Sequence, residues 1–248
     1  MSAASDHLDL FFQWEVRTWS RAYPLWRQAL QRLPGRDGQA LALGERDGGL
    51  SLMLAEHGLT TVCSDLRGPT DRARELHRSM GWQEAITYET IDALAIPKPD
   101  ASFDVVAFKS MLGALSTPDR QSQALLEAHR VLKPGGVLLW AENLAGTILH
   151  QWLRRRFVAW EHYWRYLHLP QDLSLFAPFE QVEVRTTGLL ANLGRTERQR
   201  DALARLDAVV CPWTPSGWHT VASGVAVKWE TKPGRLSECM YGHTYVRA

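Results

Sequence analysis

A glycine-rich turn and a later acidic residue are the part of this sequence whose residue types and spacing could do chemistry. The apolar run 40–43 ends at Gly44, and Gly48 opens a helix-like apolar segment. A second, β-prone run (60–64) ends in Asp65. In parallel sheets, a glycine turn after the first strand makes room for a nucleotide-type ligand, and an acid after the second accepts hydrogen bonds from ribose hydroxyls. Together these features predict a pocket for a cofactor that contains adenosine.

The turn also indicates which cofactor it would take. Arg46 stands where a dinucleotide-binding turn has a glycine, which lets the backbone approach a pyrophosphate. S-Adenosylmethionine has no phosphate, so Arg46 favours it over NAD or NADP. The absence of a Tyr-x-x-x-Lys dyad also counts against an NAD(P)-dependent oxidoreductase, which stays as a weaker alternative. A purely structural interpretation fits each residue singly, because glycines form many turns that bind nothing and Asp65 could cap a turn.

Composition limits the class of protein. The chain has 248 residues, 45% of them hydrophobic and 22% charged, which suffices for one large domain core. Its net charge of +1 provides no basic field, so we expect no nucleic-acid partner. The three cysteines form no C-x-x-C pair, and the sequence has neither a basic, apolar leader nor a long uncharged span. We therefore expect a cytoplasmic protein with no transmembrane segment.

Strand-like and helix-like apolar runs alternate through most of the chain, which is typical of a parallel sheet with crossover helices. Strands are expected near 39–43, 60–64, 85–89, 103–108, 136–141, 179–186 and 220–229. Helices are expected near 49–57, 70–80, 119–132, 147–167 and 196–209, and within 6–32, where Pro24 marks a break or a second start. The fold class is therefore α/β, a doubly wound, seven-stranded, mostly parallel sheet whose last two strands form an antiparallel edge.

Three further segments give the chain a family resemblance. They are YETIDALAIP (88–97), FDVVAFK (103–109) and EAHRVLKPGGVLLWAEN (127–143). In this order they resemble the class I S-adenosylmethionine-dependent methyltransferases, of the type 11 group, over about residues 38–145. The resemblance implies a Rossmann-like fold, S-adenosyl-L-methionine as cofactor and methyl transfer as activity. It also implies a cofactor-binding set made of Gly44, Glu45, Arg46, Gly48, Asp65, Leu66, Asp92, Ala93 and Lys109.

A narrower resemblance concerns the acceptor. The segments WEVRTW (14–19), FKSMLGAL (108–115) and GRTERQR (194–200) are similar to a bacterial group associated with surface-polysaccharide biosynthesis. This similarity implies O-methylation of a sugar, a glycan or another small molecule. The chain departs from the family pattern at Ala42, where many members have an acid, and at Arg46, where many have glycine. These departures leave open a second hypothesis, a methyltransferase-like protein that acts as a non-catalytic binding or regulatory partner.

Methyl transfer to a hydroxyl benefits from a general base, and sheets of this kind bind ligands at the carboxyl ends of their strands. Lys109 and Ser110 follow the fourth expected strand, and Glu142 and Asn143 end the fifth. We predict Glu142 or His150 as the base, because a histidine titrates near neutrality. His150 fits a helix surface equally well. The nine histidines show no metal-ligand spacing, so no metal is expected.

The segment 149–169 combines tryptophans and arginines. Its apolar stripe favours a lid helix over the acceptor site, with a membrane-surface helix and peripheral membrane contact as the alternative. The stripe consists of Leu153, Phe157, Trp160, Trp164 and Leu167. As a set, the 11 tryptophans indicate an aromatic-lined acceptor cavity or an oligomer interface, such as that of a homodimer. We expect one domain with an N-terminal helical cap (1–36), a cofactor-binding core (37–145), acceptor-side helices and last strands (146–230) and a tail (231–248).

Overall fold

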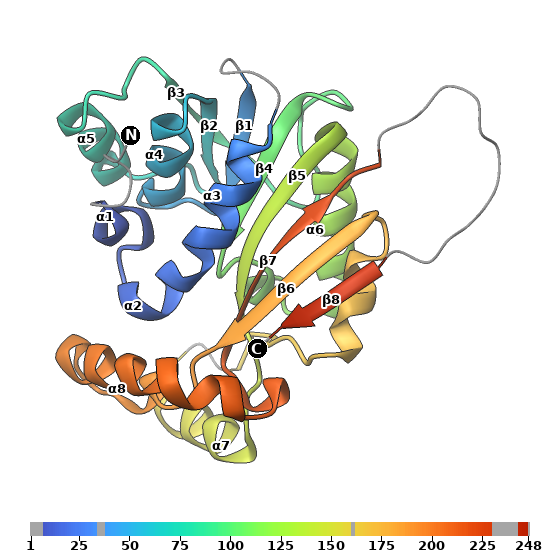
Figure 1. The fold of residues 1–248 in the computed structure, drawn as a ribbon. Coiled ribbons are helices and arrows are strands. Elements are labelled where there is room, and N and C mark those ends of the chain that lie inside the picture. The colour runs from blue at the N-terminus through green and yellow to red at the C-terminus, as the bar shows by residue number, and fades with distance from the viewer. Residues whose placement is uncertain (1–6, 34–37, 160–161, 230–242, 248) are drawn as a thin grey trace.

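The computed structural model describes residues 7–33, 38–159, 162–229 and 243–247. Its centre is an eight-stranded sheet of order β3-β2-β1-β4-β5-β7-β6-β8 (Figure 1). The strands are β1 (Gln39–Leu43), β2 (Thr60–Asp65), β3 (Ile86–Thr90), β4 (Phe103–Lys109), β5 (Leu132–Asn143), β6 (Gln181–Thr187), β7 (Val221–Val227) and β8 (His243–Arg247). All seven expected strands are present, and the predicted α/β fold class is confirmed.

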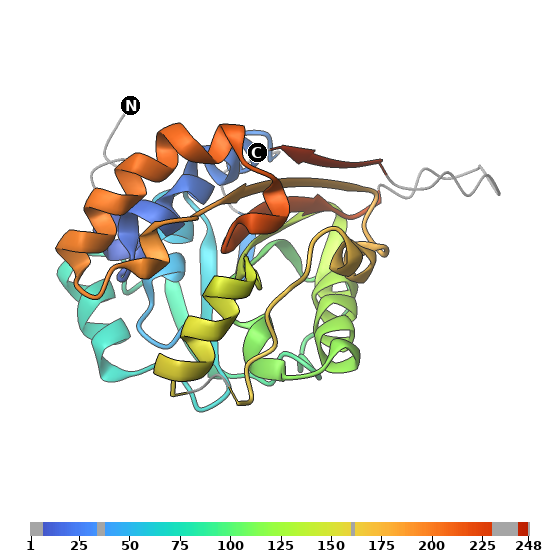
Figure 2. The same cartoon turned by 90° about the horizontal axis from the view of Figure 1, so that it is seen from below.

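Helices flank the sheet on both faces (Figures 1 and 2). The α-helices are α1 (Leu8–Phe12), α2 (Val16–Trp19), α3 (Tyr23–Gln31), α4 (Gly49–Glu56), α5 (Asp71–Ser79), α6 (Pro118–Val131), α7 (Ile148–Phe157) and α8 (Glu197–Val210). Short 3₁₀ turns are η1 (Ser20–Ala22), η2 (Leu112–Leu115), η3 (Gln171–Phe176), η4 (Ala191–Leu193), η5 (Cys211–Trp213) and η6 (Ser216–Trp218). Within residues 7–33, Pro24 lies in the first turn of α3, as a helix start there predicts.

The core lies on both sides of the sheet because successive side chains of a strand point to opposite faces. Leu41 and Leu43 of β1 join a cluster with α6 and η3, whereas Ala40 and Ala42 join a cluster with the N-terminal helices and α4. Strands buried on both faces read as continuous apolar runs, which is why the central strands were predictable.

Strand β7 gives the sheet its mixed character. It pairs antiparallel with β5 on one side and with β6 on the other, whereas the remaining paired strands run parallel. The last two expected strands, β6 and β7, therefore pair antiparallel as predicted, and β7 lies between β5 and β6. Residues 243–247 of the predicted tail pair with β6 as an eighth strand, and residues 230–242 lie outside the described part of the chain.

The helix expected over 147–167 is shorter than predicted. Helix α7 ends at Phe157, and Val158 takes an extended conformation. The chain then returns to the sheet, where the N–H of Leu167 donates to the carbonyl of Asn143 at 3.1 Å and the N–H of Ala145 donates to Leu167. This pairing with the sheet requires extended backbone, so it overrides the helical apolar spacing. Trp160, part of the predicted stripe, lies outside the described residues.

Among the described residues, no helix combines the length and apolar character needed to cross a bilayer.

Candidate functional site

The glycine turn between β1 and α4 has the backbone that its sequence predicts. Gly44 and Gly48 have φ angles of +63° and +82°, values that other residues rarely adopt. Gly44 is exposed, and a Cβ atom there would lie 2.8 Å from Cγ of Met111. Gly48 is buried, and its carbonyl accepts a hydrogen bond from Nε2 of His77 at 2.8 Å. Gly44 therefore borders the open side of the turn, whereas Gly48 serves the packing of α5.

Glu45 and Arg46, in the same turn, point to different surroundings. The buried carboxylate of Glu45 accepts a hydrogen bond from the N–H of Ser51 at 2.8 Å, in the first turn of α4. Burial raises the pKa of Glu45, and this bond opposes the rise. Arg46 is exposed, and its Nη2 lies 3.2 Å from Oδ2 of Asp47. Glu45 therefore caps α4, and Arg46 remains at the surface of the turn.

Asp65 and Asp92 lie at the ends of neighbouring strands. The N–H of Ile91 donates to the carbonyl of Asp65 at 3.1 Å, so the residues that follow β2 and β3 are adjacent. Each carboxylate accepts a hydrogen bond from the N–H two residues later in the chain. Leu66 is 62% exposed, and Ala93 is partly buried. The residues predicted to bind adenosine are therefore close together, although their local bonds also suit the turn-forming interpretation.

A cavity of about 770 Å³ begins at the glycine turn and continues along the carboxyl ends of β4 and β5. The turn contributes Gly44, Glu45, Arg46 and Asp47 to its lining. The strand ends contribute Lys109 and Ser110 from β4 and the loop after it, together with Asn143 from β5. Segment 13–19, α7 with the residues after it, and the region of η4 and α8 complete the wall. The described lining does not include Asp65 or Asp92.

Lys109 lies in an aromatic setting at the end of β4. Its Nζ donates a hydrogen bond to the carbonyl of Phe12 at 2.6 Å and lies 2.9 Å from the ring centroid of Trp14. The centroid of Trp19 is 5.5 Å away. Burial lowers the pKa of Lys109 to about 7, because removal from water disfavours the charged form. Lys109 therefore titrates near neutrality and connects α1 to the sheet.

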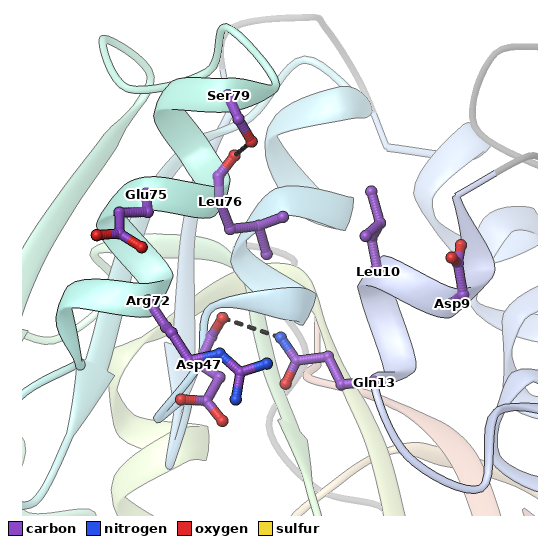
Figure 3. A pocket seen from close by; sticks show the side chains of 8 residues that line it. All are labelled: Asp9, Leu10, Gln13, Asp47, Arg72, Glu75, Leu76 and Ser79. Atoms are coloured by element: carbon purple, nitrogen blue, oxygen red, sulfur yellow. Dashed lines mark hydrogen bonds between the residues drawn. The ribbon is translucent and has the colours of Figure 1, made fainter. Parts of the chain in front are cut away.

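Residues 13–15, which we term the strap, join α1 to α2 and form one wall of the cavity. Gln13 and Glu15 have φ angles of +64° and +46°, which are strained for residues with side chains. Nε2 of Gln13 donates to the carbonyl of Asp47 at 2.9 Å, as Figure 3 shows. Gln13 and Asp47 also line a second pocket, of about 380 Å³, between α1 and α5. The strap is therefore bonded directly to the glycine turn.

Glu15 of the strap lines the cavity together with Arg200 of α8. Oε1 of Glu15 lies 3.5 Å from Nε of Arg200. Burial raises the pKa of Glu15, and the guanidinium of Arg200 opposes that rise. A second link, from Nη2 of Arg21 to the carbonyl of Ala204 at 3.2 Å, also joins the N-terminal helices to α8. Sequence reasoning missed Glu15 and Arg200, because neither follows a strand.

The segment after α7 supplies an aromatic wall. The indole of Trp164 packs against Gly113, where a Cβ atom would collide with it. The ring of Tyr166 lies 4.0 Å from Cζ of Arg154, whose Nη1 donates to two carbonyls just after β5. Trp164 and Tyr166 line the cavity together with Trp14. The expected aromatic lining is therefore present for some of the tryptophans.

Ser110 and Asn143 lie side by side at the strand ends. Nδ2 of Asn143 donates to Oγ of Ser110 at 2.8 Å. Ser110 has a φ angle of +54°, an uncommon value for a residue with a side chain. Such backbone strain is concentrated at functional sites.

Glu142, one of the two residues predicted as the base, is fully buried. Its carboxylate accepts hydrogen bonds from the N–H groups of Leu112 at 2.7 Å and Asn143 at 2.9 Å. Burial raises the pKa of Glu142 to about 7. The carboxylate therefore holds the loop after β4, and Glu142 is not among the described residues that line the cavity.

His150, the other predicted base, belongs to the N-terminal cap of α7. Its Nδ1 accepts a hydrogen bond from the N–H of Thr147 at 3.2 Å, and its Nε2 donates to the carbonyl of Leu189 at 2.8 Å. Burial lowers the pKa of His150. Both ring nitrogens are therefore engaged within the fold, and the described cavity lining does not include His150.

Comparison with known proteins identifies the central part of the chain. Residues 41–140 match the family model of a methyltransferase domain. This match makes residues 41–140 similar to a methyltransferase domain, and we use that term for them below. The methyltransferase domain is similar to the ubiquinone/menaquinone biosynthesis C-methyltransferase of Ruegeria sp. (strain TM1040), with 35% identity over 124 residues, 48% of each chain.

A second curated relative is the 27-O-demethylrifamycin SV methyltransferase of Amycolatopsis mediterranei (strain S699). It is 32% identical over 115 residues, 45% of this chain and 41% of the relative. The chain thus spans about half or less of the length of the curated relatives it matches. Phosphoethanolamine N-methyltransferase 2 of Haemonchus contortus, solved with S-adenosyl-L-methionine, has the same fold with a TM-score of 0.60 and 18% identity, over 92% of this chain and 60% of that one.

The residues of the methyltransferase domain fit S-adenosyl-L-methionine, the cofactor of this family. Gly44 leaves the cavity side of the turn free of a side chain. Asp65 has a second carboxylate oxygen beyond the one bonded to the turn, and Leu66 exposes an apolar surface that a purine can cover. Lys109 brings an amine to the cavity where Ala42, fully buried in β1, offers no polar side chain. These side chains suit the ribose, the adenine and the methionine carboxylate of the cofactor.

Proposed function

We propose that this protein transfers a methyl group from S-adenosyl-L-methionine to a hydroxyl group of a small molecule. The observation that carries this proposal is the continuity of the cavity from the glycine turn to the aromatic wall of Trp164 and Tyr166. A cofactor bound at the turn and an acceptor bound at the aromatic wall would share one space. Methyl transfer needs that proximity, because the donor and acceptor atoms must be aligned.

Residues on either side of the turn suit different parts of the cofactor. Asp65 would accept hydrogen bonds from ribose hydroxyls, and Asp92 with the N–H of Ala93 would contact adenine. Lys109 would attract the carboxylate of the methionine part. S-Adenosyl-L-methionine supplies an activated methyl group when bound, so the chain has to align the acceptor and exclude water. Alignment of this kind can contribute about 7–11 kcal/mol.

We assign the role of general base to Glu15 in place of Glu142 or His150. Glu15 lines the cavity, whereas the other two side chains are engaged in holding a loop and a helix cap. Burial raises the pKa of Glu15, which makes its carboxylate a stronger base for a hydroxyl proton. Its contact with Arg200, at 3.5 Å, keeps the side chain in place.

The acceptor that suits this cavity is a small molecule with a ring system and a hydroxyl. Trp14, Trp164 and Tyr166 offer aromatic surface to such rings. The name of the Amycolatopsis relative refers to an O-methylated product, which supports a hydroxyl acceptor. The name of the Ruegeria relative refers to C-methylation, which makes a carbon acceptor the second candidate. A glycan acceptor also suits aromatic walls, but the surface-polysaccharide role gains no support from these names.

Cofactor binding is the first test. Calorimetry should detect binding of S-adenosyl-L-methionine to the wild type, and Asp65→Asn should weaken it about tenfold or more, because a hydrogen bond to a charged group contributes about 1.5–3 kcal/mol. Asp119→Asn, at the exposed start of α6, is the matched control and should leave affinity unchanged. Failure of the wild type to bind would favour the non-catalytic hypothesis.

An assay of methyl transfer is the second test. The protein is incubated with methyl-¹³C-labelled cofactor and a pool of small hydroxylated aromatic compounds, and labelled products are identified by mass spectrometry. A ¹³C chemical shift in the methoxy range would support O-methylation, and one in the C-methyl range would overturn it. Glu15→Gln should keep cofactor affinity but lower the rate roughly 100-fold or more. Equal rates for Glu15→Gln and the wild type would remove Glu15 from the mechanism.

A further inference from the structure

Helix α7 has an exposed face that combines large apolar side chains with arginines. Ile148, Leu149 and Trp152 are 81%, 55% and 55% exposed. Arg155 and Arg156 are also exposed, and their spacing places them on the same side of the helix, one turn after Trp152. We term these five residues the α7 face. Helix α7 lies at the lower edge of the molecule in Figure 1 and at the near side in Figure 2.

The opposite side of α7 is anchored firmly in the fold. His150 and Arg154 are buried, and both donate hydrogen bonds to backbone carbonyls of neighbouring loops. Thr147 caps the helix, because its Oγ1 accepts a bond from the N–H of His150 at 3.4 Å. The α7 face is therefore presented by a rigid helix, and it is not the frayed end of a loose segment.

The charge of this region has one sign. Residues 148–159 include three arginines and no aspartate or glutamate. The acids of the first two turns of α8 are engaged elsewhere, because Glu197 pairs with Arg200 at 2.8 Å and Asp201 lies 3.9 Å from Arg17. Apolar side chains beside arginines such as Arg155 and Arg156, which pair with no acid among the described residues, are the composition of helices that lie in the interface of an anionic bilayer.

A second copy of the chain suits this face less well. A two-fold contact through α7 would bring four exposed arginines into one interface, and the segment 148–159 offers no acid to neutralise them. Anionic headgroups would neutralise them, while Ile148 and Trp152 enter the boundary between headgroups and acyl chains. Charge complementarity therefore favours a lipid surface over self-association.

We infer that the α7 face docks on anionic membrane surfaces. Arg154 and Phe157 of the same helix line the cavity, so docking would bring the cavity wall close to the lipid. The chemical class of ligand is a bilayer rich in acidic headgroups. This inference concerns a surface outside the cofactor site and does not depend on the acceptor proposed above.

Vesicle flotation with the 248-residue protein tests the inference. Vesicles of phosphatidylcholine with about 30% phosphatidylglycerol should bind the wild type, and pure phosphatidylcholine should bind it at least about tenfold less. The double variant Ile148→Glu/Trp152→Glu and the double variant Arg155→Glu/Arg156→Glu should each lower binding to acidic vesicles about tenfold or more. Binding should also fall as salt rises. Leu126→Glu, at an exposed position of α6, is the matched control and should bind like the wild type.

Circular dichroism and cofactor affinity of each variant separate loss of docking from loss of folding. Failure of the wild-type protein to bind acidic vesicles would overturn the inference. Binding that survives both double variants would overturn it as well. A dimer that dissociates in the Ile148→Glu/Trp152→Glu variant, without any vesicle binding by the wild type, would assign the face to self-association instead.

Discussion

Lys109 shows how one buried residue can make the site sensitive to pH. Its amine is bonded to the carbonyl of Phe12 and covered by Trp14, and burial lowers its pKa to about 7. The protein therefore holds at neutral pH a mixture of charged and neutral lysine beside the glycine turn. A cation there attracts a carboxylate, so we expect cofactor affinity to decline as the pH rises through 7.

The same shift in pKa predicts how stability depends on pH. Between pH 7 and about 10.5 the unfolded state binds more protons at this lysine than the folded state, so its contribution to stability rises with pH. Below pH 7 both states are protonated, and the cost of burying the ammonium group is fully present. Relative to Lys109→Met, the wild type should gain up to about 1.4 kcal/mol per pH unit in this window.

Urea denaturation at pH 7, 8 and 9 measures this gain. Lys133→Met removes a partly exposed lysine that pairs with Asp104, and it serves as the control. The control should show a much smaller pH-dependent difference from the wild type. Parallel stability profiles for Lys109→Met and the wild type would contradict the shifted pKa.

A buried carboxylate connects helix α8 to the loop after β6. Asp207 is fully buried and accepts hydrogen bonds from the N–H groups of Leu189, Leu190 and Ala191 at 3.1, 2.8 and 3.0 Å. These residues precede Asn192, which lines the cavity. At the scale of elements, Asp207 therefore positions both the loop after β6 and the helix that carries Arg200.

Asp207→Ala should destabilise the protein by at least about 3 kcal/mol, because it leaves three inward-facing N–H groups without their carboxylate. Chemical denaturation measures the loss. Asp201→Ala, on the same helix but half exposed, should change stability by less than about 1 kcal/mol. Similar losses for the two variants would mean that the loop finds other partners.

Elements with strong local patterns were predictable, and elements defined by distant contacts were not. The sheet strands have apolar runs buried on both faces, so β1 and β4 were readable from the sequence alone. The end of α7 depends on the pairing of Leu167 with Asn143, which local spacing does not reveal. The strap depends on positive φ angles at Gln13 and Glu15. Glutamine and glutamate rarely adopt such angles, so the sequence does not predict them.

The candidate site divides in the same way. Gly44, Asp65 and Lys109 lie at or directly after the ends of strands, and parallel strands gather such residues at one edge of a sheet. Its position at the end of a strand also selected Glu142. Strand ends give no information on local hydrogen bonds, however, and backbone N–H groups donate to the Glu142 carboxylate. Glu15 reaches the site from an N-terminal segment, and only the cluster of tryptophans around it hinted at a role.

At the scale of the whole molecule, cofactor binding should be visible as thermal stabilisation. A ligand at 100 times its Kd stabilises the folded state by about 2.7 kcal/mol, which corresponds to a Tm increase of roughly 5–10 °C for a chain of this size. S-Adenosyl-L-methionine should produce this increase in differential scanning calorimetry, and NADH at the same concentration should not. The reverse result would support the oxidoreductase alternative.

The cavity is closed by two segments that lie far apart in the sequence, which has a consequence for biosynthesis. Gln13 and Arg200 line the same space, and Arg21 is bonded to the carbonyl of Ala204. On the ribosome, the strap must wait for most of the polypeptide to be translated before its partners in α8 exist. Until then Glu15 lacks its partner Arg200, and the nascent chain has the glycine turn but an incomplete cavity wall. The wall that the strap forms with α8 is therefore assembled late in synthesis, long after the glycine turn has been translated.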